Sequence, residues 1–91
     1  MREIIRKRMG CSEEKAETIE KKLQEICPEL KPVLREWLET GKEDSDKTYE
    51  GFSVNRLMKE YGMRFTGALL TIDWLIRDPK AAKKAIGEGI R

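Results

Sequence analysis

The chain contains no histidine among its 91 residues. Without histidine it cannot assemble a Ser-His-Asp or Cys-His nucleophile, a histidine-ligated zinc site, or the usual switch of charge near neutral pH. Its two cysteines, Cys11 and Cys27, are too few for a structural zinc or iron–sulfur site. We therefore expect no catalytic residue, no metal and no cofactor, and we predict that the protein is not an enzyme.

Long apolar segments are also missing. The most apolar stretch, residues 65–76, is interrupted by Thr66, Thr71 and Asp73 and is far shorter than the roughly 20 residues needed to span a bilayer. The basic amino terminus is not followed by the apolar run of a secretory signal. We expect a cytoplasmic protein with reduced thiols and no membrane partner. The overall pattern is typical of small bacterial proteins.

Charge is abundant but unevenly distributed. The formal net charge is +2, with +3 in residues 1–9, −5 in residues 10–50 and +4 in residues 51–91. If the two basic ends lie side by side, they form a patch that could bind a nucleic acid. The candidate residues for that patch are Arg2, Arg6, Lys7, Arg8, Lys80, Lys83 and Lys84. Exposed lysines on solvated helices are common, so this binding surface is the weaker alternative.

The apolar spacing is helical along the whole chain, and we find no strand signal. Glycines and capping residues divide the pattern into segments: Ser12, Ser53 and Asp78-Pro79 begin helices, and Gly10, Gly41 and Gly62 end them. Phe52 is placed to pack on Leu57 as a hydrophobic staple. We predict an all-α fold, a compact bundle of five to six short helices in one domain, residues 1–91. Residues 41–51 form a charged loop and residues 87–91 a frayed tail.

The predicted helix from Phe65 to Arg77 is the most informative, and we expect it at the centre of the bundle. Gly67, Leu70 and Trp74 share one face of this helix, opposite a wider apolar arc. That second face packs either inside the bundle or against a partner. The arc consists of Phe65, Ala68, Leu69, Ile72, Leu75 and Ile76, and a polar edge of Thr66, Asp73 and Arg77 lies beside it.

Two motifs suggest chemistry but favour a plain structural role. The segment around Gly62 has the spacing of a helix-turn-helix, yet its second helix would present Phe65, Leu69 and Asp73 to DNA, and these are poor readers of base edges. Ser12 and Lys15 match an SxxK pattern, but Ser12 is already a helix cap. Asp73 most simply forms an ion pair with Arg77, four residues later.

The carboxylates of the 41–51 loop could hold a hard cation. However, Tyr49 and Asn55 stand where a calcium loop requires glycine and glutamate, so we interpret the loop as solvated.

The sequence thus favours a non-enzymatic protein–protein interaction module, which binds another protein or itself as a homodimer. Its candidate partner face is Gly67, Leu70 and Trp74, with Trp74 as the anchor. The alternative is a nucleic-acid-associated regulator.

Overall fold

The computed structural model describes residues 1–88, and these residues form six α-helices, one short 3₁₀ helix and no named strand. The predicted all-α fold of short helices is therefore confirmed. Chain contacts divide the protein into two units, Met1–Lys42 and Glu43–Arg91. The boundary lies in the predicted charged loop. That the whole chain acts as one domain stays a prediction, and each unit is described by itself.

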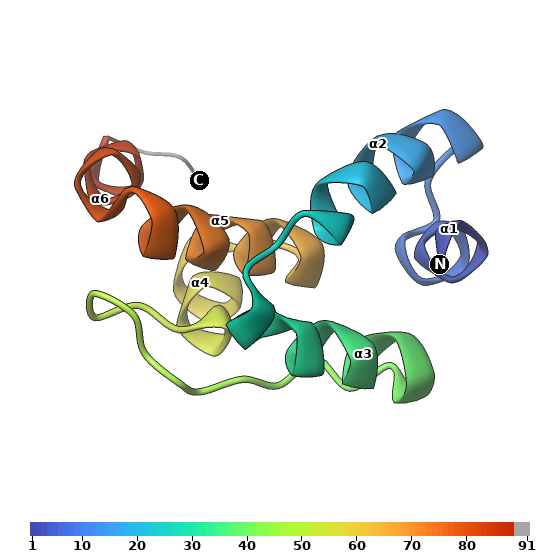
Figure 1. Cartoon of the computed structure of the whole chain (residues 1–91), viewed down its shortest axis with the longest axis horizontal. Helices are drawn as coiled ribbons and strands as arrows, with labels where there is room; N and C mark the ends of the chain where they lie inside the picture. Colours follow the sequence, from blue (N-terminus) through green and yellow to red (C-terminus); the bar gives the residue numbers. More distant parts are fainter. Residues whose placement is uncertain (89–91) are drawn as a thin grey trace. The chain divides into compact units, whose positions relative to one another are not determined.

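The first unit contains α1 (Arg2–Met9), α2 (Glu13–Gln24), the 3₁₀ helix η1 (Pro28–Leu30) and α3 (Lys31–Thr40) (Figure 1). Helix α1 packs against α2, and η1 leads directly into α3. The helix boundaries predicted at Gly10 and Ser12 are confirmed. The backbone of Gly10 adopts the left-handed conformation that ends α1, and the Ser12 hydroxyl caps α2 by accepting a hydrogen bond from the Lys15 amide at 3.2 Å.

Arg8 joins the two ends of the first unit. Its guanidinium lies 5.8 Å from the ring centroid of buried Trp37 and donates a hydrogen bond to the Leu38 carbonyl at 3.3 Å. Gly41 ends α3 with a φ of 78°, a left-handed conformation that favours glycine, and a Cβ there would push the end of the Arg8 side chain aside. A basic residue of α1 thereby caps the carboxyl end of α3, where the helix dipole favours a positive charge.

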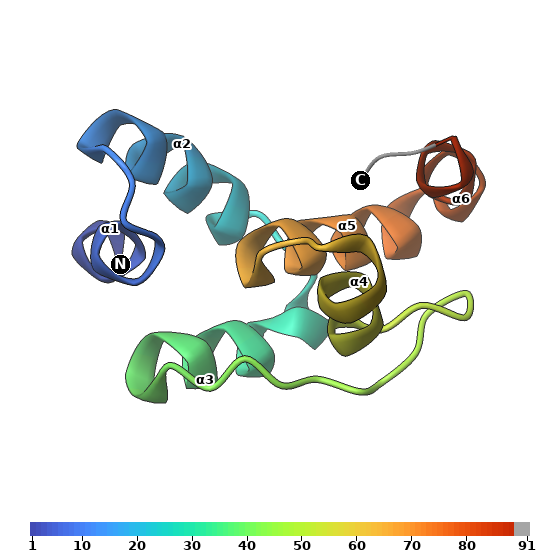
Figure 2. The same ribbon diagram turned by 180° about the vertical axis from the view of Figure 1, so that it is seen from behind.

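The second unit contains α4 (Val54–Tyr61), α5 (Phe65–Arg77) and α6 (Pro79–Gly87). Helix α5 packs against both α4 and α6; Figures 1 and 2 show α4 alongside it and α6 beyond its carboxyl end. Ser53 caps α4 by accepting from the Arg56 amide at 3.0 Å, and Asp78 caps α6 by accepting from the Ala81 amide at 3.3 Å. Within this unit, α5 is central as predicted.

The charged loop is more ordered than its composition suggests. Tyr49 and Phe52 exchange two backbone hydrogen bonds of 2.7 and 2.9 Å around a tight turn at Glu50 and Gly51, both with positive φ. The Asn55 side chain holds the loop's start by donating to Asp44 and accepting from the Ser45 amide. Phe52 contacts Tyr61 edge to face at 6.1 Å, whereas its predicted staple contact with Leu57 stays a prediction.

The carboxyl terminus differs slightly from expectation. Gly87 is the last residue of α6 rather than the start of a frayed tail, and Glu88 follows as its cap. The rest of the predicted tail, residues 89–91, lies outside the described residues.

Two glycines give a matched test of this fold. Gly62 has a φ of 67°, whereas Gly67 is helical, and a Cβ built at either position meets no atom within 4 Å. We expect Gly67→Ala to stabilise the protein by up to about 1 kcal/mol through helix propensity. Gly62→Ala should destabilise it by about 1 kcal/mol because alanine is strained in the left-handed region. Urea unfolding measures both changes, and equal signs would contradict the assignment of Gly62 as the turn.

Candidate functional site

The wide apolar arc of α5 is the core of the second unit. Phe65, Ala68, Leu69, Ile72 and Leu75 are all buried, at 2% exposure or less, and Ile76 is half-buried. Apolar side chains at spacings of three and four residues lie on one side of a helix, and α4 and α6 pack against α5. The arc predicted from the sequence is therefore confirmed as core.

The opposite face of α5 is more open. Gly67 is exposed, Leu70 is half-buried, and Trp74 keeps 38% of its surface accessible. Among the described residues the most exposed large hydrophobic side chains are Met1, at 40%, and Trp74. A Cβ at Gly67 would meet no atom within 4 Å, so the surface two helical turns before Trp74 is unfilled. We call Gly67, Leu70 and Trp74 the outer face of α5.

Polar groups flank the outer face on both sides. On one side the Asp73 carboxylate accepts hydrogen bonds from Arg77 Nε at 3.0 and 3.2 Å, which confirms the predicted ion pair. On the other side the buried Thr71 hydroxyl donates to the Gly67 carbonyl at 2.8 Å. Thr71 thus satisfies its hydroxyl within the helix, and the exposed apolar ring of Trp74 lies between neutralised polar neighbours.

Thr66 does not lie on a solvated polar edge as expected. It is only 3% exposed, whereas Asp73 is partly exposed and Arg77 is exposed. The sequence prediction placed Thr66 with Asp73 and Arg77 because its side chain carries a polar hydroxyl. A threonine in a helix can form a hydrogen bond within the protein through that hydroxyl while its methyl group is buried.

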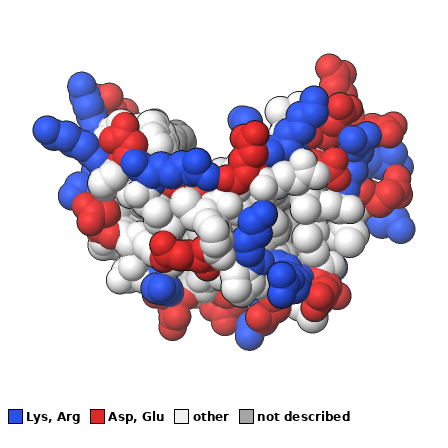
Figure 3. Space-filling model, in the orientation of Figure 1, with Lys and Arg blue, Asp and Glu red and all other residues white. Residues whose placement is uncertain are grey.

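Two of the basic residues of α1 contact other helices of the first unit, and two are exposed to solvent. Arg2 pairs with Glu20 at 3.3 Å and lies 4.0 Å from Glu17, both on α2, and Arg8 is engaged with α3 as described above. Arg6 and Lys7 are exposed. Over α2, at the upper right of Figure 3, Lys and Arg side chains are interspersed with Asp and Glu. Two of the four α1 candidates for a nucleic-acid patch therefore hold this unit together instead.

On α6, Lys83 pairs with Glu50 of the loop at 3.2 Å, and Lys80 and Lys84 are exposed. Because α1 and α6 belong to different units, a single patch formed by both stays a prediction.

The helix-turn-helix comparison fails on burial. The turn at Gly62 exists, but Phe65, Thr66 and Leu69 of the following helix are buried, at 3% exposure or less. Buried side chains cannot reach base edges in the major groove. This supports the core interpretation of α5 over DNA reading.

The other candidate chemical motifs have structural roles or lack support. Ser12 is engaged as the cap of α2, and Cys11 and Cys27 are half-buried and are not joined in a disulfide. Among residues 1–88 no group of three or more Cys, Asp and Glu side chains is placed to hold a metal ion. In the same residues no helix is long and apolar enough to cross a membrane.

Sequence reasoning missed the contact of Arg8 with α3. Its partners lie about 30 positions along the chain, and helical periodicity carries no information on such distant pairs. The sequence near Arg8 offered little help. It shows only that Arg8 is a basic residue in the last turn of α1, which ends at Gly10.

Comparison with known proteins gives no relative: no family model, no curated protein and no solved structure matches the chain. The function is therefore argued from this structure alone.

Arg8 provides a test of the structural role of the basic residues. We expect Arg8→Ala to lower the free energy of unfolding by about 1 kcal/mol, because it removes a cation–π contact and a charged hydrogen bond at an exposed site. The control is Arg6→Ala, which removes the same charge from an exposed position of the same helix. Its effect should stay within about 0.5 kcal/mol. Equal losses in urea unfolding would show that Arg8 acts only through net charge.

Proposed function

We propose that this chain is a non-enzymatic protein–protein interaction module that associates with a second copy of itself through the outer face of α5. The observation that carries the proposal is that a partly exposed tryptophan and an open glycine surface share one helix face. Trp74 is 38% exposed, and Gly67 has no neighbour within 4 Å of where a Cβ would stand. Exposed tryptophans are frequent anchors of protein interfaces.

The spacing of the two residues fits a symmetric pair. Gly67 and Trp74 are seven residues, or two helical turns, apart, which is about 10.5 Å along the axis. In an antiparallel pair of α5 helices whose two-fold axis passes between Leu70 and Thr71, Trp74 of each copy lies opposite Gly67 of the other. The same patch then serves both partners, as two-fold symmetry requires. A glycine also lets the partner's ring approach the helix backbone closely.

The size of the face limits the strength of such a dimer. One partly exposed tryptophan, one half-buried leucine and a glycine make a small apolar patch, whereas stable dimers commonly bury about 1,600 Å² in total. We therefore expect a weak, reversible dimer with a dissociation constant in the micromolar range.

Sedimentation equilibrium tests the homodimer. The wild type should show a rising average mass through the high micromolar range, and Trp74→Ala should weaken association about ten-fold or more by removing the anchor. Gly67→Gln should also weaken it, because its side chain occupies the space needed by the partner's Trp74. Glutamine is a good helix former, so this variant should remain folded.

Lys59→Ala, at an exposed position of α4, is the control and should associate like the wild type. A wild type that stays monomeric at high micromolar concentration rules out the dimer, and unchanged association in Trp74→Ala rules out the outer face as its interface.

The nucleic-acid alternative makes a different prediction. Binding through Lys80, Lys83 and Lys84 should weaken steeply with added salt through counterion release and should fall when these lysines are neutralised. The engagement of Arg2, Arg8 and Lys83 in ion pairs and hydrogen bonds favours the interaction module instead. Fluorescence anisotropy with labelled DNA and RNA at two salt concentrations distinguishes the two proposals.

A further inference from the structure

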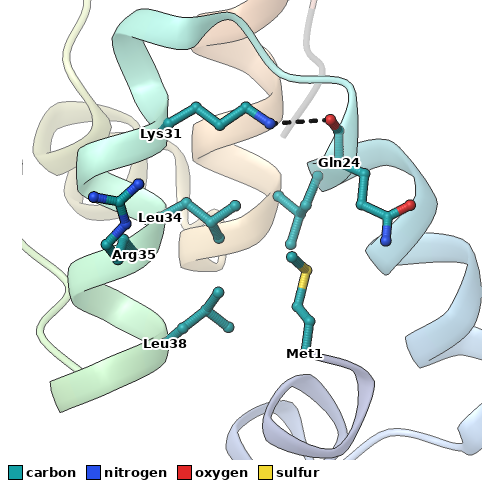
Figure 4. A pocket seen from close by; sticks show the side chains of 7 residues that line it. Met1, Gln24, Lys31, Leu34, Arg35 and Leu38 are labelled. Carbon is teal, nitrogen blue, oxygen red and sulfur yellow. Dashed lines mark hydrogen bonds between the residues drawn. The ribbon is translucent and has the colours of Figure 1, made fainter.

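The first unit contains a pocket of about 220 Å³ between α2 and α3, with the start of the chain at its mouth (Figure 4). The side chains that line it are Met1, Leu23, Gln24, Lys31, Leu34, Arg35 and Leu38. Leu38 is half-buried and Met1 is exposed, so these two supply most of its accessible apolar wall, whereas Leu23 and Leu34 are almost fully buried at its base. Figure 4 shows Leu34 and Leu38 projecting from α3 toward the side of Met1.

The charged residues that line this pocket have one sign. Lys31 and Arg35 are one turn apart on α3, and both line the pocket, whereas no carboxylate does. Lys31 Nζ donates a hydrogen bond to the Gln24 backbone carbonyl at 3.2 Å, which places its ammonium group at one edge. The Arg35 guanidinium has no hydrogen bond or ion pair to any residue between 1 and 88 and retains its full capacity for an anion.

The size of the pocket limits what can occupy it. A docked helix needs a row of apolar anchor sites three and four residues apart, and this is a single pocket. Its volume is below the roughly 300–1,000 Å³ of pockets that enclose drug-sized ligands. A single short apolar tail fits the volume, and covering the apolar part of the lining with such a tail removes that surface from water.

We propose that this pocket binds a small anion with a single apolar tail, of the class of medium-chain carboxylates. The tail lies against Met1, Leu34 and Leu38, and the carboxylate pairs with the guanidinium of Arg35, which can engage both oxygens at once. This site lies wholly in the first unit and is independent of the proposed dimer through α5.

Methyl NMR on the full chain tests the site with octanoate as the probe. Octanoate should shift the Leu34 and Leu38 methyl signals in a saturable way at millimolar concentration. Acetate, which has the charge without the tail, and octylammonium, which has the tail with the opposite charge, should bind far more weakly. Arg35→Gln should weaken octanoate binding about five-fold or more by removing a charged hydrogen-bond donor.

Lys59→Gln is the matched control, because it removes the same charge from an exposed position of α4. It should bind octanoate like the wild type. Arg35→Glu adds a second check that does not depend on lost stability: with Lys31 still present the charges lining the pocket then cancel, so the preference for octanoate over octylammonium should disappear. Three results would each overturn the proposal: no methyl shift with octanoate, equal binding of octanoate and octylammonium by the wild type, or equal losses in Arg35→Gln and Lys59→Gln.

Discussion

Burial of the apolar arc of α5 is the constraint on which the second unit depends. Five of its side chains are almost completely withdrawn from water, and each fully buried Leu, Ile or Phe contributes about 1.5–3 kcal/mol. The tight turn at Gly62 places α4 against this arc, and the Asp78 cap followed by proline begins α6 beyond it. Since α4 and α6 pack against α5 and the arc is buried, the short capped helices of this unit serve mainly to enclose one apolar surface.

The outer face of α5 follows from the same constraint. A helix with apolar residues on two sides can bury both only if its neighbours surround it, and Trp74 stays more than one-third exposed. Gly67 costs helix stability without relieving any close contact within the described residues. Gly67 therefore lowers the stability of the helix and gives the monomer no packing contact in return. For this reason we link the outer face of α5 to association.

The helices were largely predictable from local signals, whereas contacts between distant residues were not. Ser12, Ser53 and Asp78 cap helices and Gly10, Gly41 and Gly62 end them, as their residue types predict, because capping depends on neighbours within four positions. The Arg8 contact with α3 and the tether of Asp44 to Asn55 escaped prediction because they join segments that lie far apart in sequence.

The same limit applies to the candidate sites. The outer face of α5 was found from helical periodicity, since its three residues lie on one helix. The pocket beside α3 was missed because its lining comes from two separate helices, α2 and α3, and from the start of the chain. Lys31, Leu34, Arg35 and Leu38 did share one side of a helix, but this spacing alone is also typical of an ordinary amphipathic surface.

The central claim is that Trp74 is partly exposed to solvent in the monomer and is covered by a second copy in the dimer. The fluorescence of Trp74 tests this claim directly. In a Trp37→Phe background Trp74 is the only tryptophan. Its emission should be quenched readily by acrylamide at low micromolar protein, then shift to shorter wavelength and become protected as the concentration rises. Emission that stays equally quenchable across the whole concentration range would contradict the account.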